Sequence, residues 1–199
     1  MHEPYSDDQG VRWMLAYREG DEAAFDALVA EYSPQVYALL TRFLGNREGR
    51  EDLVQEVFLR VIRARERYQP SARFSTWLYR IVFNLSINET QRASSREQTG
   101  GERDQGHGAE MLLEIGDDGA NDPVDELATL DVVAAVRRAI ARLPETQRMA
   151  LILAKYEEMP YVDIAAVIGT SEKAVKSLVH RARENLREWL APHLQGDLS

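Results

Sequence analysis

The side chains best suited to chemistry lie in one stretch, "GTSEKAVKSLVHRARENL", which runs from Gly169 to Leu186. Its lysines and arginines recur at successive helical turns, a spacing that follows the phosphates of a nucleic acid. Serine and histidine side chains lie among them, and such groups hydrogen-bond to base edges in a major groove. We therefore expect DNA contact from Ser171, Glu172, Lys173, Lys176, Ser177, His180, Arg181 and Arg183.

The residues just before this stretch predict the helix that positions it. In "PYVDIAAVIG", Pro160 suits the first turn of a helix and Gly169 suits its end. A short helix, a tight turn and a second, basic helix make up the helix-turn-helix pattern, here at about residues 160–187. A basic helix face is by itself usually only a solvated face, so the first helix and the turn are what favour DNA binding.

A second polar stripe lies in "RFSTWLYRIVFNLSINETQR", residues 73–92. Cations bind the backbone of an unpaired nucleic-acid strand, and aromatic and amide groups bind its unstacked bases. Trp77 also has the spacing of a core residue, so its place in the core or on the DNA side stays open. The candidates for this contact are Arg73, Thr76, Trp77, Arg80, Asn84, Asn88 and Arg92.

The elements that position these residues are all predicted to be helices. Apolar residues recur at spacings of three and four, and no segment shows sustained alternation, so the fold class is all-α. Before residue 93 we expect one helix capped by Asp21 and ended by Gly45, a second capped by Asn46, and a third capped by Ser75. After the middle of the chain we expect helices at 131–143 and 145–156, followed by the helix-turn-helix.

The middle of the chain differs in composition from both flanks. It is rich in serine, glycine and charge, and such a segment buries too little apolar surface to offset the entropy of ordering it. We therefore expect two small helical domains joined by a flexible acidic linker. The expected boundaries are 1–92 with a short N-terminal extension, a linker at 93–126, a second domain at 127–190 and a tail at 191–199.

Composition excludes several classes of function. The 199 residues include no cysteine, so disulfides and thiolate metal sites are excluded, and the net charge of -9 argues against indiscriminate binding to nucleic acid. The N-terminus lacks the features of a signal peptide, and no apolar run approaches the roughly 20 residues that span a bilayer. The four histidines are scattered, and no HExxH or P-loop pattern occurs. We expect a cytoplasmic protein that is not an enzyme and has no cofactor.

Two blocks resemble a known family. "YVDIAAVIGTSEKAVKSLVHRARENL" resembles the region 4 helix-turn-helix of sigma-70 family initiation factors, and "REDLVQEVFLRVIRARERYQPSARFSTWLYRIVFNLSINETQR" resembles their region 2. The order of the blocks and the short linker resemble the extracytoplasmic function (ECF) group. The resemblance implies a region 2 bundle of three to four helices and a factor that binds RNA polymerase core, recognises promoter -10 and -35 elements, and is controlled by an anti-sigma factor.

The resemblance also implies roles for particular residues. The "DLVQE" helix matches the segment that docks on the β′ clamp helices, which implies core binding by Asp52, Gln55, Glu56 and Phe58, with the β flap as a further contact. The 73–92 stripe matches the -10 segment, and the loop "RYQPSARF" matches a pocket for a flipped-out base. The basic helix matches the -35 reader. It departs from the family at Leu178, where a basic residue is common, which puts the -35 preference in doubt.

Two other classes of protein stay open at this point. A stand-alone helix-turn-helix regulator with an N-terminal sensor or dimerisation domain would bind its operator tightly without a polymerase. The segments "DLVQE" and "FSTWLYRI" count against it, because a sensor domain does not need them. A helical enzyme is the third class, and the scattered histidines count against it.

Overall fold

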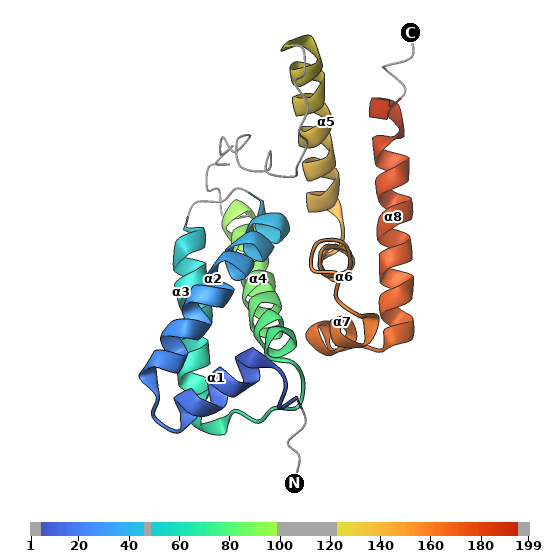
Figure 1. Ribbon diagram of the computed structural model, residues 1–199. Helices are drawn as coiled ribbons and strands as arrows, with labels where there is room; N and C mark the ends of the chain where they lie inside the picture. Colours follow the sequence, from blue (N-terminus) through green and yellow to red (C-terminus); the bar gives the residue numbers. More distant parts are fainter. Residues whose placement is uncertain (1–4, 46–48, 99–122, 195–199) are drawn as a thin grey trace.

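The computed structural model describes residues 5–45, 49–98 and 123–194, and in these the chain forms eight α-helices, one 3-10 helix and no strand (Figure 1). This confirms the all-α fold class. No helix in these ranges is long and apolar enough to cross a membrane. The helices are α1 (Gln9–Arg18), α2 (Glu22–Leu44), α3 (Arg50–Ala64), α4 (Phe74–Gln98), α5 (Pro123–Arg142), α6 (Glu145–Tyr156), α7 (Tyr161–Ile168) and α8 (Glu172–Leu194), with η1 (Arg65–Arg67) after α3.

Several helix ends agree with the sequence prediction. Asp21 caps α2, because its carboxylate accepts hydrogen bonds from the N–H groups of Ala23 at 3.0 Å and Ala24 at 3.3 Å. Gly45 ends α2 with a φ of 75°, which glycine adopts without strain. Asn46, the expected cap of α3, lies outside the described residues. Ser75 was expected to cap α4, but α4 already begins at Phe74.

Helices also extend into the segment predicted as a linker. Helix α4 continues to Gln98, and α5 begins at Pro123 rather than near residue 131. Residues 99–122, the rest of that segment, lie outside the described residues.

Helix α1 was not predicted, because the start of the chain was expected to be a short N-terminal extension. The Asp8 carboxylate caps it by accepting from the Val11 N–H at 2.8 Å, and Val11 and Met14 are fully buried. A Cβ at Gly10 would lie 2.7 Å from Cβ of Phe74, so only glycine allows α1 to approach α4 this closely. Ten residues form a marginal helix alone, and tertiary packing therefore stabilises α1.

Helix α4 lies between the two groups of helices, α1–α3 and α5–α8 (Figure 1). Its side chains Phe74, Leu78 and Val82 are fully buried, and they belong to one apolar cluster that extends from α1 to α8. Helix α4 packs against α2 and α3 and also against α7, and α2 packs against α6. The sequence predicted two small helical domains joined by a flexible acidic linker, and in the structure the two groups of helices also share an apolar core.

Polar contacts at Glu157, between α6 and α7, strengthen this interface. Its Oε2 accepts a hydrogen bond from Tyr79 Oη of α4 at 2.9 Å, and its Oε1 lies 3.5 Å from Arg42 Nη1 of α2. Burial and the nearby Glu157 charge raise the pKa of Tyr79 well above its ordinary value. The phenol therefore stays protonated near neutral pH and remains a donor to the carboxylate.

A second set of contacts joins the two groups at the ends of α2 and α4. Arg148 of α6 donates from Nη1 to the Phe43 carbonyl at 2.9 Å and from Nη2 to the Leu143 carbonyl at 3.0 Å. On α4, Thr90 Oγ1 lies 2.5 Å from Glu145 Oε1 of α6. These contacts fix the first turn of α6 against α2 and α4.

Glu157→Gln should loosen the contact between the two groups of helices. The change removes the charge from the bonds to Tyr79 and Arg42, which should cost about 1.5 kcal/mol and raise the population of separated forms about tenfold. The chain has no cysteine, so dyes attached to Asp26→Cys and Glu188→Cys, both at exposed positions, report the separation by energy transfer.

Glu158→Gln is the matched control, because Glu158 is the exposed neighbour of Glu157. Equal energy transfer in the two variants would mean that Glu157 does not hold the interface.

Candidate nucleic-acid interface

A pocket of about 480 Å³ lies between the end of α3 and the start of α4. We call it the strand pocket. Two aromatic rings in it, those of Tyr68 and Trp77, meet edge to face with their centroids 5.0 Å apart. Cations and aromatic rings together suit the phosphates and unstacked bases of a single strand. The pocket is lined by Arg60, Arg63, Ala64, Arg67, Tyr68, Gln69, Ser71, Trp77 and Arg80.

Helix α1 and the start of α2 support the strand pocket from behind. Arg18 Nη1 donates to the Tyr68 carbonyl at 3.1 Å, and the Arg65 guanidinium lies over the Tyr17 ring at 4.2 Å. Arg65 also pairs with Glu22 at 3.0 Å. Tyr68 is 3% exposed, and burial, followed by the charge of Asp8, raises its pKa well above the ordinary value. A neutral, buried ring therefore forms the base on which Trp77 rests.

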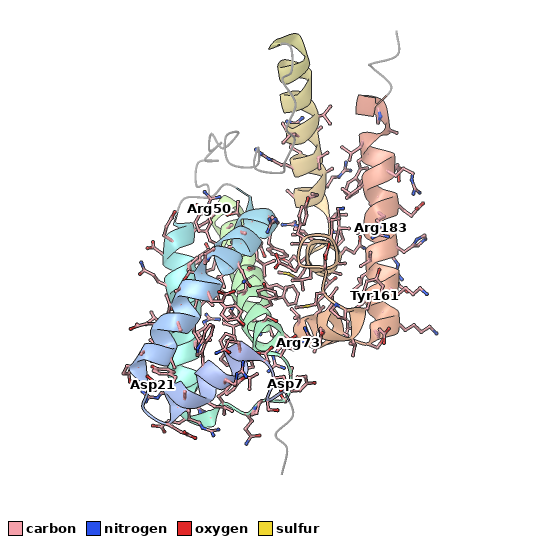
Figure 2. All side chains as sticks on the ribbon, in the orientation of Figure 1. Asp7, Asp21, Arg50, Arg73, Tyr161 and Arg183 are labelled. Carbon is pink, nitrogen blue, oxygen red and sulfur yellow. The ribbon has the colours of Figure 1, made fainter. Side chains whose placement is uncertain are left out.

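The outer face of α4 continues the polar surface away from the strand pocket. Arg73 lies just before the helix (Figure 2), and Arg80, Asn84 and Asn88 are exposed at helical spacing along it. A second hollow, of about 530 Å³, is lined by Asn88, Gln91, Arg92 and Ser95. The polar face therefore extends over about five turns of one helix, the length of a strand that several nucleotides could follow.

The outer face of α3 has a different character. Asp52 and Gln55 are exposed and Glu56 is partly exposed, so an acidic and amide surface points to solvent. Two apolar side chains continue it, with Leu59 45% and Ile62 39% exposed. We call Asp52, Gln55, Glu56, Leu59 and Ile62 the docking face, because charge beside exposed apolar area is typical of a protein-binding surface.

The second basic surface lies on α8. Ser171 caps this helix by accepting from the Ala174 N–H at 3.2 Å, and Val175 and Val179 are buried beneath it. A hollow of about 590 Å³ opens between α8 and the start of α6, where Thr146 lies. All eight residues predicted to face DNA from this helix are exposed, including Arg183 (Figure 2). The hollow contains four of them, namely Ser171, Lys173, Ser177 and Arg181.

Comparison with known proteins decides the family. A family model of Sigma-70 region 2 matches residues 28–96, and one of Sigma-70 region 4 matches residues 134–186. The chain is 31% identical over 173 residues to the ECF RNA polymerase sigma factor SigW of Bacillus subtilis. The aligned residues make up 87% of this chain and 92% of SigW. The chain belongs to the sigma-70 family, in its ECF group.

Two further comparisons agree with this assignment. The RNA polymerase sigma-H factor of Pseudomonas aeruginosa is 31% identical over 192 residues, which is 94% of this chain and 97% of that protein. A structure of the sigma factor RpoE in complex with the anti-sigma factor NepR, from Bartonella quintana, shares the fold with a TM-score of 0.63. It is 23% identical and covers 84% of this chain and 96% of that one.

Membership in the sigma-70 family establishes the class of activity. Sigma factors bind RNA polymerase core and promoter DNA, and they are initiation factors rather than enzymes. The stand-alone regulator is not favoured, because the region 2 match covers the α3 and α4 segments that such a regulator does not need.

The structure brings most of the predicted -10 residues of this sigma factor onto one surface, with one correction. Thr76 is only 2% exposed, because it turns into the domain one position away from the outer line of α4. Trp77, left open between core and DNA, packs on Tyr68 and Phe74 and also lines the strand pocket. Part of the Trp77 ring is therefore covered by the aromatic rings of Tyr68 and Phe74, and another part is accessible in the strand pocket.

The predicted core-binding set of the sigma factor also needs one correction. Phe58 is 7% exposed and its ring packs edge to face on Phe25, so it supports α3 from inside. Leu59 and Ile62 take its place on the surface. Neither Leu59 nor Ile62 was among the residues predicted to bind core, although both follow Gln55 at helical spacing.

The arginines contributed by α3 and η1 were also missed. Arg60, Arg63 and Arg67 line the strand pocket, and their spacing of three and four marked a common face. Leu178, the departure from the family pattern, is partly buried and borders the hollow on α8. It packs against the core, which accounts for an apolar residue there.

We predict that Arg80→Ala and Asn84→Ala reduce open-complex formation more than closed-complex binding. Their expected ligand is the melted strand, which exists only after opening. Permanganate footprinting separates the two steps. Arg12→Ala, which removes an exposed cation from α1, is the control for the loss of charge. Undiminished capture of a pre-melted template by the Arg80 and Asn84 variants would show that α4 does not bind the strand.

On α8 we predict two classes of variant. Lys176→Ala and Arg181→Ala remove cations, so each should flatten the salt dependence of promoter binding by about 0.9 in slope per lost phosphate contact. Ser177→Ala and His180→Ala should instead change the preferred -35 sequence, at about 1–3 kcal/mol per lost base contact. Promoter binding by the holoenzyme over a series of salt concentrations measures the slope, and selection of a randomised -35 library measures the sequence preference. An unchanged preference in Ser177→Ala and His180→Ala would place base readout elsewhere on α8.

Proposed function

We propose that this sigma factor docks on RNA polymerase core through the α3 docking face, captures the -10 strand in the strand pocket and along α4, and reads the -35 element with α8. The observation that carries the proposal is the strand pocket, where four arginines meet two aromatic rings at the start of α4. The residues proposed to contact the -10 strand are Arg73, Trp77, Arg80, Asn84, Asn88 and Arg92, together with the pocket arginines.

The chemistry of the docking face supports a cationic protein partner. The carboxylates of Asp52 and Glu56 lie at i and i+4 of one helix, with the Gln55 amide between them. Guanidinium groups on the polymerase clamp helices could form paired hydrogen bonds with them. Leu59 and Ile62 would add apolar area at the centre of such an interface.

Promoter binding requires the two groups of helices to separate. Helix α7 packs against both α4 and α8, and helix axes in contact lie about 8–10 Å apart, so α4 and α8 are about 20 Å apart. The -10 and -35 elements are about 25 base pairs apart, which is about 85 Å of B-DNA. We therefore propose that the packed arrangement is a resting form and that core polymerase holds the separated form.

Regulation by a protein of the anti-sigma class fits this resting form. The RpoE structure of similar fold is a complex with an anti-sigma factor. We propose that a partner of this class holds the present chain away from the polymerase, in the cytoplasm where transcription takes place. The β flap of the polymerase would be a further contact of the α5–α8 group.

Run-off transcription with purified core polymerase on genomic fragments tests the proposed function. The wild-type chain should direct discrete transcripts. The double variant Asp52→Lys, Glu56→Lys should neither transcribe nor co-purify with core, while its helical circular dichroism spectrum is unchanged, because both residues lie off the apolar side of α3.

The matched control reverses two exposed charges away from α3, Glu19→Lys and Glu31→Lys, and should keep core binding. Wild-type co-purification of the Asp52, Glu56 variant would remove α3 as the docking element.

A further inference from the structure

Glu56 lies where the docking face and the strand pocket meet. Its Oε1 accepts a hydrogen bond from Arg60 Nε at 3.0 Å and lies 3.7 Å from Arg63 Nη1. Both of these arginines line the strand pocket. One carboxylate therefore belongs to the docking face and at the same time neutralises cations of the pocket.

The four pocket arginines thus fall into two pairs. Arg60 and Arg63 share Glu56, whereas Arg67 and Arg80 form no ion pair with any residue that the structure describes. An arginine already paired with a carboxylate releases fewer counterions from a nucleic acid than a free one. In the chain without polymerase, only part of the positive charge of the strand pocket is therefore available to attract a nucleic-acid strand.

The ion pairs of Glu56 with Arg60 and Arg63 are weak enough to be replaced by a pair with another cation. Its side chain is 32% exposed and that of Arg60 is 33% exposed, and ion pairs with this much solvent contact are weak. A guanidinium from a docked partner, held in place by the rest of an interface, would compete successfully for the same carboxylate.

We propose that Glu56 couples polymerase docking to strand capture. A polymerase cation that binds Glu56 leaves Arg60 and Arg63 without their neutralising partner, and both become available to the phosphates of the -10 strand. The strand pocket would then reach its full charge only on the polymerase, where the promoter is melted. The inference rests on the proposed function, since it needs both docking at α3 and strand binding in the pocket.

Glu56→Gln in the full-length chain without polymerase mimics the docked state, because glutamine keeps the shape of the side chain and removes its charge. The probe is a short fluorescent single strand of randomised sequence, and binding is measured by anisotropy across a series of KCl concentrations. We expect about two- to fivefold tighter binding. The slope of log affinity against log salt should become steeper by up to about 1.4, from two released cations at about 0.7 each.

Two comparisons separate this coupling from a general effect of charge. Glu66→Gln removes one exposed carboxylate from η1, beside the pocket, and Glu66 forms no ion pair among the described residues. It should leave the slope nearly unchanged. In an Arg60→Gln, Arg63→Gln background, Glu56→Gln should give no gain, because the cations it releases are absent.

The outcomes also distinguish the coupling from the function on which it rests. An equal gain for Glu66→Gln, or a gain that persists without Arg60 and Arg63, would overturn the coupling. If wild-type holoenzyme captures a pre-melted promoter while free Glu56→Gln binds the probe like wild type, the coupling is wrong and the proposed function stands. If wild-type holoenzyme fails to capture that promoter, both are wrong.

Discussion

The structure depends on the burial of helix α4 from two directions. Phe74, Leu78 and Val82 fill the core, and Tyr79 reaches the loop after α6. Only one narrow side of α4 is left for solvent, and the exposed arginines and asparagines are confined to it. This confinement accounts for a polar stripe at helical spacing, because Thr76, which lies one position off the line, is turned inward. The same packing holds the stripe in place along one side of the helix.

The protein has local cationic surfaces although its net charge is negative. A chain with a net charge of -9 is repelled by DNA as a whole, yet four arginines line one pocket and basic residues cover the outer side of α8. Each cationic surface is small, so each alone gives modest affinity for phosphates. Affinity becomes high when a scaffold holds both surfaces over the same DNA, because the second contact is then intramolecular. Dependence on a polymerase thus follows from how the charges are divided.

The contact between the two groups of helices combines a continuous apolar cluster with few polar bonds. The Arg42–Glu157 pair is partly exposed, with side-chain exposures of 26% and 15%, so its contribution is modest. The apolar contact between α4 and α7 also stabilises this interface, because the hydrophobic effect scales with the apolar surface removed from water. Such an interface persists in the free chain but can yield to a partner that binds the separated form better. A regulatory protein could therefore act by favouring the packed arrangement.

Much of this protein is determined locally by its sequence. Helical periodicity, the Asp21 cap and the Pro160–Gly169 segment depend on neighbours within a few residues, and these features predicted the all-α fold and the helix-turn-helix. The spacing of Arg80, Asn84 and Asn88 likewise placed them on one side of a helix before any packing was known. Tertiary structure decided the rest, because burial depends on residues distant in the chain. Only packing could turn Phe58 and Thr76 inward, expose Ile62, order α1 around Gly10, and bring Glu157 to Tyr79, since no local pattern records which side of a helix meets another helix.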